Sequence, residues 1–479
     1  MKRHFALTSI FRQPRRLRRS QTVKVKIALL CVAFASASLL SAQVNCPTAS
    51  TKTSAPLVCQ YPYSGSVLAL IYYGGNLPAN TATDQVYQQL YAAGSQTATP
   101  INASIATQLA QLPMPSAAAG TVTLRLPGSD VGSPFNNLGP ILSDRPDTFP
   151  RRKFFLSFAY QHFNFTEIDG LQLNSFVLGA QVQNVNLAGN TGTFYGGLQS
   201  KVGLQMDQYI GLLTYGLTKS TDVTIAVPVN DVTMNVTSNN YQGYFYSPTT
   251  GIYTLLTSPG LTTQAPLITK GSASGVGDVT VNVKQQLFGQ EGRYAGAVGA
   301  QVRVPTGDAN NYLGSGAYGV NAYGLVEYRG AFKHHGIAPH VKIGYQWNGA
   351  SQLLDIQHPP HENLPGGLNY AVGADFGLLR TVTLVADVVG NQYVNAPSLS
   401  AGLIMLPTSK QAGLAIPPTL PYSIPGNTTY TTFNFSGGVK WIVPKTREHI
   451  LLYANVLVPA NDVGLHSDLV PLVGIAFKR

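Results

Sequence analysis

Residues 276–316 contain two neighbouring segments in which apolar and polar side chains alternate along the chain. In the first segment one face is apolar (Val279, Val281, Val283 and Leu287) and the other is polar or charged (Asp278, Thr280, Asn282, Lys284 and Gln286). The second segment, 294–304, repeats the pattern after a short polar turn. Alternation with a period of two predicts β-strands. Such a strand pair fits either half of a soluble sandwich or the wall of a barrel with lipid outside and water inside.

The same alternation recurs from residue 153 towards the C-terminus and predicts twelve strands. We expect them at 153–165, 201–216, 220–236, 276–288, 294–304, 317–332, 337–348, 367–378, 381–392, 429–443, 448–458 and 469–477. Most are 10 to 16 residues long. Strands of soluble proteins average about 5–6 residues, whereas a strand that crosses a membrane needs about 9–11. The lengths therefore favour a membrane barrel.

The connections between these strands alternate between long and short. The long ones are 166–200, 237–275, 305–316, 349–366, 393–428 and 459–468, and the short ones are 217–219, 289–293, 333–336, 379–380 and 444–447. Bacterial outer-membrane barrels have short periplasmic turns, long outer loops and an even number of strands. The sequence therefore predicts an all-β fold, an antiparallel outer-membrane β-barrel of about 12 strands. The range is 10–14 strands, because 171–183 and 192–198 could form an extra hairpin.

In this barrel each strand would have a lipid face and a lumenal face. Trp347 and Trp441 would lie at opposite ends of the wall, in the interfacial aromatic girdles. The charged side chains of the inward faces are the candidates for lining the lumen: Asp278, Lys284, Arg303, Glu327, Arg329, His340, Lys342, Asp375 and Lys440. Either they pair across the wall and fill a narrow interior, or they form a constriction that selects solutes.

The net charge of +11 comes from the start of the sequence. Residues 1–42 hold nine Lys or Arg and no acid, which leaves 22 basic against 20 acidic residues in the remainder. We therefore expect no nucleic-acid partner. A basic region followed by an apolar run from Ile27 to Leu40 is typical of a secretory signal, and we expect residues 1–42 to be a signal peptide. No later run reaches the 18 apolar residues of a transmembrane helix.

Residues 43–150 have a different composition, rich in Ala, Ser, Thr and Pro, with weak helical patterns at 84–91 and 101–112. Two interpretations stay open for this Pro/Ala-rich N-terminal extension: a plug inside the pore, or a periplasmic extension with short helices. The barrel would then cover residues 151–479. Cys46 and Cys59 remain after the signal peptide, and in an oxidising compartment we expect them to form a disulfide.

We expect no catalytic site, no cofactor and no metal site. Asp355, His358 and His361 have a spacing that could hold a metal, but two prolines between the histidines prevent a helical ligand face. The G-x-S-x-G motif of serine hydrolases is absent, since GSASG places Ala273 where the nucleophile would be.

Three short motifs carry a resemblance to a known family. A G-x-G-D strand start is formed by Gly275, Gly277 and Asp278, and a PTGD turn (305–308) is followed by LG-x-G (313–316). With the strand pair at 215–229, these motifs resemble the outer-membrane transporter family named for the meta-pathway of phenol degradation. The resemblance covers about residues 150–479. It implies a barrel that is distantly like the long-chain fatty-acid and aromatic-hydrocarbon uptake channels, whose N-terminal segment plugs the barrel.

Together, the strand pattern and the resemblance predict a channel or transporter in the cell outer membrane for small hydrophobic or aromatic compounds. Its expected partners are outer-membrane lipid, such solutes and the outer-membrane assembly machinery. The terminal strand, with Phe477 near its end, resembles an outer-membrane insertion signal. Two alternatives are a structural or surface-binding barrel without transport and an outer-membrane hydrolase. The hydrolase would need a serine and a histidine facing each other on adjacent strands.

Overall fold

The structure is a computed structural model. It describes residues 43–44, 101–111, 115–116, 138–187, 189–255, 267–289, 293–332, 335–351, 353–354, 362–379, 381–408, 410, 416–444, 446 and 450–478. The chain divides into two units, Met1–Leu40 and Ser41–Arg479, and all described residues belong to the second. The expected signal peptide, the Cys46–Cys59 disulfide and the group Asp355, His358 and His361 lie outside the described residues.

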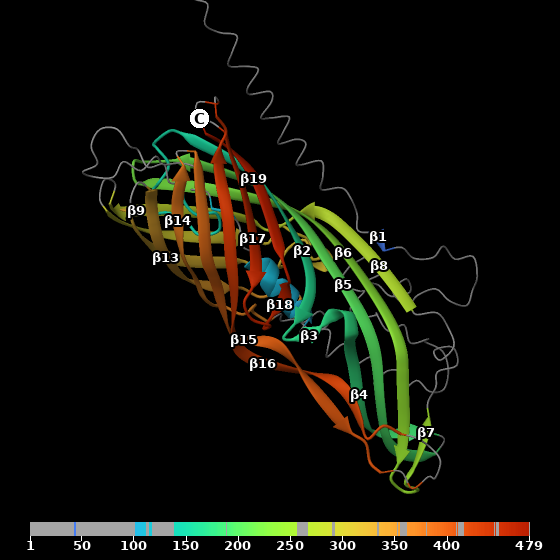
Figure 1. Cartoon of the computed structure of the whole chain (residues 1–479). Helices are drawn as coiled ribbons and strands as arrows, with labels where there is room; N and C mark the ends of the chain where they lie inside the picture. Colours follow the sequence, from blue (N-terminus) through green and yellow to red (C-terminus); the bar gives the residue numbers. More distant parts are fainter. Residues whose placement is uncertain are drawn as a thin grey trace, which may run out of the picture. The chain divides into compact units, whose positions relative to one another are not determined.

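Twelve antiparallel strands close into a barrel (Figure 1). In chain order they are β2 (Phe154–Ile168), β5 (Asn190–Gly216), β6 (Thr221–Ser247), β9 (Val279–Phe288), β10 (Tyr294–Val304), β11 (Gly319–Tyr328), β13 (His335–Asn348), β14 (Gly367–Leu379), β15 (Val382–Met405), β16 (Thr419–Ile442), β17 (Ile450–Pro459) and β19 (Val470–Lys478). Each pairs with the next, and β19 pairs with β2, for example Val473 with Tyr160, which closes the barrel. All twelve predicted strands are confirmed, and so is the all-β barrel.

Smaller elements complete the sheet around these twelve strands. They are β1 (Gln43–Val44), β3 (Leu171–Gln172), β4 (Phe176–Leu187), β7 (Ile252–Leu255), β8 (Leu267–Val276), β12 (Gly330–Phe332), β18 (Leu465–Ser467) and the 3-10 turns η3 (Leu173–Ser175) and η4 (Ala309–Asn311). The extra hairpin expected in the first long connection is present, because β4 pairs with the first part of β5. We call the barrel end with the short connections the turn end and the opposite end the projecting end.

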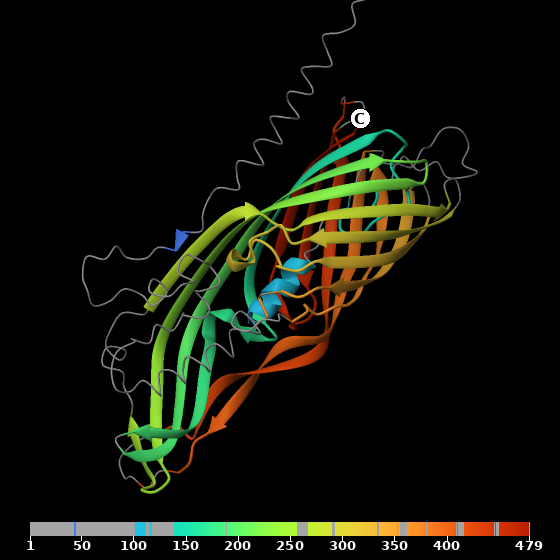
Figure 2. The same cartoon turned by 180° about the vertical axis from the view of Figure 1, so that it is seen from behind.

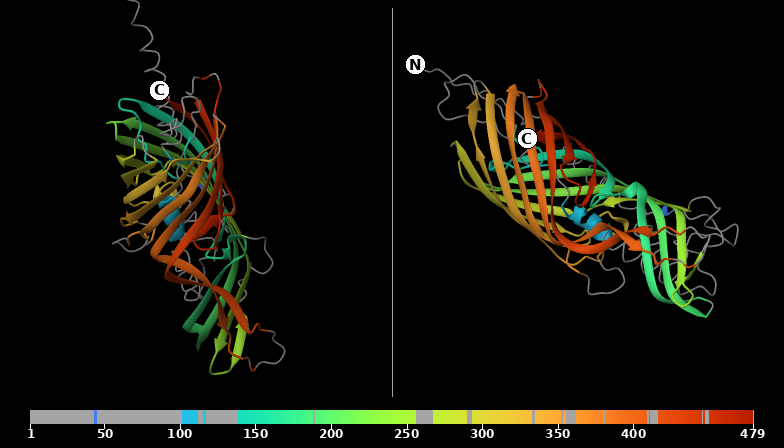
Figure 3. Two further views of the ribbon diagram at one scale, coloured as in Figure 1. Left: turned by 60° about the vertical axis from the view of Figure 1, so that its left-hand side comes forward. Right: turned by 60° about the horizontal axis from the view of Figure 1, so that its bottom comes forward.

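Four strands are much longer than predicted and continue past the barrel at the projecting end (Figures 1 and 3). β5 and β6 have 27 residues each, and β15 and β16 have 24 each. At about 3.3 Å per residue, 27 residues reach roughly 90 Å, several times the depth of a bilayer core. The prediction of loops at 166–200, 237–275 and 393–428 was therefore wrong for much of their described length, which is extended and paired.

The projecting hairpins are stabilised by packing against each other, because an isolated two-stranded ribbon is at best marginally stable in water. Tyr195 and Tyr244 of β5 and β6 and Tyr253 of β7 form an apolar cluster with Ile404 and Leu420 of the β15–β16 hairpin. The Tyr253 hydroxyl also donates to the carbonyl oxygen of Pro407 at 2.7 Å. The cluster joins hairpins that are about 150 residues apart in sequence.

A β-bulge directs the β15–β16 hairpin away from the barrel wall. The pairing register shifts between Tyr393 and Ala396, and Asn395 there has a φ of +50°. Asparagine tolerates this left-handed conformation better than most residues, and a bulge bends and twists the strand that contains it. Beyond the bulge, the hairpin turns towards β4, as the two views in Figure 3 show.

Most of the barrel's outer surface carries the apolar side chains predicted to face lipid. Val283, Leu287 and Ile343 are exposed on the outside, whereas Lys284 and His340, on alternate positions, are buried inside. This confirms the predicted faces of β9 and β13. Trp347 and Trp441 are also exposed, at opposite ends of their strands, in agreement with interfacial girdles.

The apolar band has a clear upper limit on β2 and β5. Tyr160 and Tyr209 pack on each other there, with ring centroids 5.2 Å apart. One position further along each strand, His162 and Asp207 form an ion pair of 2.8 Å. From Asp207 outwards the exposed positions of β5 are polar. The projecting hairpins therefore lie beyond the lipid, and the rule that periplasmic turns are short places them on the extracellular side.

Two stretches of the N-terminal extension lie inside the barrel, a helix at 101–110 and a segment at 138–150 (Figure 2). The helix is near the projecting end, where Ile101, Ile105 and Ala106 pack in an apolar cluster with Leu204, Met234 and other inward residues. None of the helices in the described ranges is both long and apolar enough to cross a membrane.

Candidate functional site

The segment 138–150 crosses the lumen at the turn end and is fastened to strands on different sides of the wall. At its start, the Leu138 amide donates to Thr383 Oγ1 at 3.0 Å, and Lys440 Nζ donates to the Leu138 carbonyl at 3.1 Å and to that of Pro140. At its end, the Phe149 amide donates to Asp222 Oδ2 at 2.9 Å. Because Lys440 lies on β16 and Asp222 on β6, the segment spans the interior.

The middle of the segment is held by buried charges. Arg145 donates to both carboxylate oxygens of Glu327, from Nε at 3.0 Å and from Nη2 at 2.9 Å. Arg329 bridges Glu327 at 2.9 Å and Asp147 at 2.6 Å, and Lys284 Nζ contacts Asp144 at 3.0 Å. Bidentate contacts between charged groups are among the strongest hydrogen bonds in proteins. We call this set the floor network: Asp144, Arg145, Asp147, Lys284, Glu327 and Arg329.

The structure places all nine predicted lumenal residues on inner positions of the wall, and eight of them are buried. Four contact the N-terminal segment: Lys284, Glu327, Arg329 and Lys440. His340 lies between two aspartates of neighbouring strands, with Nε2 2.9 Å from Asp387 and Nδ1 3.9 Å from Asp375. Pairing thus dominates, but several partners come from the N-terminal segment and not from the wall.

Asp278 organises the turn that the sequence motifs predicted. Its Oδ1 accepts the Gly307 amide at 3.1 Å, and its Oδ2 accepts the amide and hydroxyl of Ser315 at 2.8 and 2.6 Å. A Cβ on Gly314 would lie 2.2 Å from Asp278 Oδ1, so this glycine gives the carboxylate its space. The G-x-G-D, PTGD and LG-x-G motifs therefore meet in one hydrogen-bonded turn and serve the architecture.

Arg303 connects this turn to the N-terminal helix. Its Nε lies 3.7 Å from Asp278 Oδ2, and its Nη1 donates to the carbonyl of Ala110 in the last helical turn. Helix C-termini carry partial negative charge and unpaired carbonyls, which a guanidinium satisfies. Tyr312, at the end of η4, also donates to Asn102 Oδ1 at 2.5 Å. The helix is thus fastened at both ends to the 305–316 connection and to β10.

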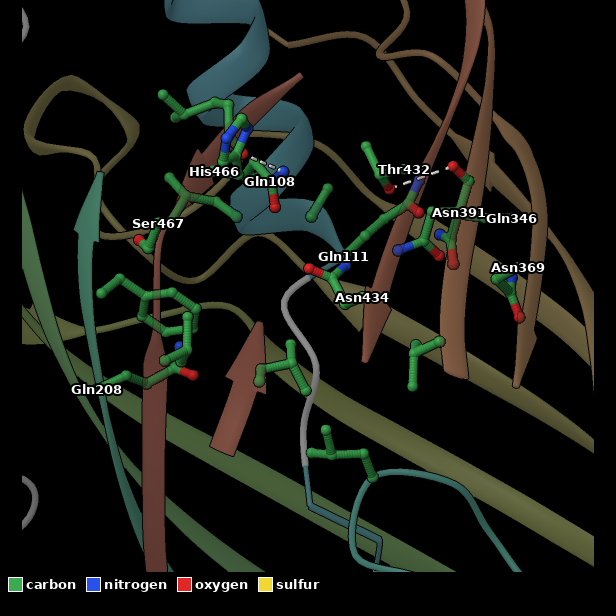
Figure 4. Close-up of a pocket in the computed structure, with 18 of the residues that line it drawn as sticks. Gln108, Gln111, Gln208, Gln346, Asn369, Asn391, Thr432, Asn434, His466 and Ser467 are labelled. Atoms are coloured by element: carbon green, nitrogen blue, oxygen red, sulfur yellow. Dashed lines mark hydrogen bonds between the residues drawn. The ribbon is translucent and has the colours of Figure 1, made fainter. Parts of the chain in front are cut away.

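A cavity of about 210 Å³ lies between the end of the helix and the floor network. Its polar wall is a row of carboxamides on successive strands, which we call the amide belt: Gln301, Asn321, Gln346, Asn369 and Asn391. Asn369 Nδ2 donates to Asn321 Oδ1 at 3.1 Å, across the intervening strand at Gly344. Figure 4 shows Gln346, Asn369 and Asn391 on neighbouring strands, with Gln111 from the helix end projecting between the walls.

The rest of the cavity lining is apolar or cationic. Phe163 and Phe165 of β2, Leu142 of the crossing segment and Leu465 of β18 supply apolar surface. Lys342 of β13 lines the cavity, and its Nζ lies 4.3 Å from the centre of the Tyr323 ring. The interior is therefore apolar around the helix, amide-rich at mid-depth and charged at the turn end.

One further group of ligand-type side chains occurs in the part of the chain that the structure describes. Glu167, Asp462 and His466 bring their ligand atoms within 4.8 Å of one another at the projecting end. Glu167 and His466 already form an ion pair of 3.2 Å. The group is accounted for by this pair.

Residues 183–457 match the family described as "Putative MetA-pathway of phenol degradation". The chain belongs to this family. The match spans more than half of the sequence and most of the barrel, from β4 to β17. The motif turn around Asp278, the floor-network residues Lys284, Glu327 and Arg329 and the amide belt all lie within the part of the chain that this family shares.

The meta-pathway family member also has a barrel fold in common with solved structures. An outer membrane channel from Pseudomonas putida F1 is 11% identical, with 70% of this chain and 97% of that chain covered at a TM-score of 0.38. The toluene transporter TodX of Pseudomonas putida is 8% identical (75% and 99% covered, TM-score 0.26). A FadL homologue of Pseudomonas aeruginosa is 10% identical (68% and 88% covered, TM-score 0.24). A search among curated proteins gave no match.

Proposed function

We propose that the protein is an outer-membrane channel for small hydrophobic or aromatic compounds. The observation that carries the proposal is the cavity of about 210 Å³ inside a lipid-facing barrel, bordered by apolar side chains on the extracellular side. A ligand site is typically concave and mostly apolar, with a few polar groups that fix orientation. The family name and the titles of the toluene transporter and the outer membrane channel agree with this class of solute.

In this proposal the N-terminal extension acts as the plug. The helix 101–110 partly fills the extracellular half of the lumen, and the segment 138–150 closes the turn end through the floor network. A solute would enter beside the helix, rest in the cavity and leave when the segment moves aside. The lumenal candidates Lys284, Glu327, Arg329 and Lys440 then hold the closed state, while Lys342 faces the solute.

Two alternative functions account for less of the interior. A purely structural barrel gives no reason for a cavity with buried polar atoms that lack protein partners, such as Gln111 Nε2 and Ser467 Oγ. A hydrolase would need a histidine to take a proton from a serine. Among the described residues, both ring nitrogens of His340 and of His466 contact carboxylate or carbonyl oxygens instead. We propose no catalytic role.

Uptake by Gram-negative cells with and without the protein tests the proposal. Cells carrying it should take up radiolabelled toluene faster than cells with an empty vector, and arabinose uptake should not change. The protein must first show heat-modifiable migration on a gel, which verifies a folded barrel. A folded barrel that accelerates the entry of no aromatic solute would favour the structural alternative and overturn the channel.

A further inference from the structure

Lys342 differs from the other buried or part-buried basic residues of the lumen. Lys284 contacts Asp144, Arg303 contacts Asp278, Arg329 contacts Asp147 and Glu327, and Lys440 donates to two backbone carbonyls. Among the described residues, Lys342 has no carboxylate within 4.0 Å and no hydrogen-bond acceptor, only the ring face of Tyr323. The charge of Asp144 also acts on Lys342, but that carboxylate is bonded to Lys284.

The neighbours of Lys342 on the wall do not compensate its charge. On the two flanking strands it pairs in register with Leu325 and Ala371, which are both buried. A buried or half-buried ammonium ion without an anion is costly. Its side chain lines the cavity, so the missing counter-charge can come from a bound solute.

Two further polar atoms in the cavity wall are without a partner. Gln111 Nε2, at the end of the helix, and Ser467 Oγ, on β18, are buried and make no hydrogen bond. Both are donors, and buried donors are nearly always satisfied by protein, water or ligand. With Lys342 they give the cavity an excess of donors, which fits a ligand rich in acceptor oxygens.

The opposite part of the lining suits the remainder of such a ligand. Phe163, Phe165, Leu142 and Leu465 offer apolar surface. The cavity of about 210 Å³ exceeds the ~150 Å³ of an engineered apolar cavity that binds benzene. One ring, or a short alkyl chain, with a carboxylate attached therefore fits the available space.

We propose that the cavity binds small amphipathic carboxylates, with the carboxylate beside Lys342 and the apolar body against Phe163 and Phe165. The inference rests on the proposed channel function and narrows its solutes to anions with an apolar body. An aromatic acid and a short-chain fatty acid share this chemistry, and the test separates them.

Isothermal titration calorimetry of the full-length protein in detergent provides the test. Benzoate should bind at least tenfold more tightly than benzamide, which has nearly the same shape but no charge. The substitution Lys342→Met should weaken benzoate binding about tenfold and change benzamide binding less than twofold. Lys201→Met, at an exposed position of β5, should leave both unchanged. Hexanoate in place of benzoate shows whether the apolar wall prefers a chain or a ring.

Equal affinity for benzoate and benzamide in the unaltered protein would overturn the inference, and this comparison does not depend on whether the variant folds. So would a Lys342→Met variant that binds benzoate normally. The two proposals fail differently. If toluene enters cells through the barrel but benzoate has no advantage over benzamide, only the carboxylate site is wrong. If neither neutral nor anionic aromatic compounds bind or pass, the channel itself is wrong.

Discussion

Removing the arginine at the centre of the floor network should open the barrel. In the closed state Glu327 is fully buried and receives two hydrogen bonds from Arg145, at 2.9 and 3.0 Å. The substitution Arg145→Met leaves Oε2 without this donor, while Arg329 still donates to Oε1 at 2.9 Å. Breaking a buried ion pair on one side costs about 3–5 kcal/mol. We take the lower value because of Arg329, and about 3 kcal/mol corresponds to a roughly 100-fold shift of the open-to-closed ratio.

Single-channel recording in planar lipid bilayers measures this ratio directly. Arg145→Met should raise the ratio of open to closed time about 100-fold, whereas Arg151→Met, at an exposed position outside the network, should not change it. The double substitution Arg145→Met/Glu327→Met removes the uncompensated carboxylate and should recover at least tenfold of the closure, because replacing both partners costs less than removing one. Unchanged gating in the single variant, or equal gating in the single and double variants, would refute the role assigned to the floor network.

Three other substitutions test separate parts of the structure. Gly344→Ala should destabilise the barrel by about 1–3 kcal/mol in urea unfolding, because its Cβ would lie 2.7 Å from amide-belt oxygens, whereas Gly324→Ala, with nothing within 4 Å, should not. Val283→Arg, on the lipid face, should cost about 2–4 kcal/mol on folding into vesicles, and Asn235→Arg, beyond the lipid, about 0–1; equal costs would contradict the placement of the band. Asp169→Ala frees the two backbone amides that its carboxylate accepts, so limited proteolysis should cut the β15–β16 hairpin faster.

Asp169 also gives the projecting region a defined pH response. Burial raises the pKa of this carboxyl, and the amides of Leu399 and Gly464 act in the opposite direction. Because the folded-state pKa lies above the unfolded one, the folded state takes up the proton first as the pH falls. The contribution of Asp169 to stability therefore improves on acidification between the two values and does not weaken. Acid-induced loosening of this hairpin that disappears in Asp169→Ala would contradict the sign.

The barrel could be predicted from the sequence because its two faces have opposite solvents. Each strand such as 294–304 alternates without a break, and the short turns are too short to hide further structure. The projecting hairpins could not be predicted in the same way. Beyond Asp207 both faces of β5 meet water or a local core, so the outward positions become polar and the alternation that marks lipid ends. Their strand structure depends on the tyrosine cluster, whose members are distant in sequence.

The interior residues of the wall could be predicted as inward, but their partners could not. Lys284, Glu327 and Arg329 are inward by alternation alone, whereas Asp144 and Arg145 stand in a stretch without periodicity. One signal was available: residues 144–147 are the densest group of charges between residues 43 and 150. A group of that kind, just before a barrel whose lumen carries unmatched charges, points to pairing across the interior. The amide belt gave no signal, because single Asn and Gln residues on separate strands acquire meaning only from the register.

The chemistry of the two anchored stretches indicates which of them moves. The helix 101–110 is held mostly by apolar contacts, with Ile101, Ile105 and Ala106 buried against the wall. Exposing that surface to water in an open lumen would cost about 25 cal/mol per Å². The segment 138–150 is held largely by ion pairs, and charges that separate into a water-filled lumen regain their hydration. The net cost of releasing the segment is therefore much smaller than the number of its contacts suggests, so we expect gating at the floor network while the helix stays in place.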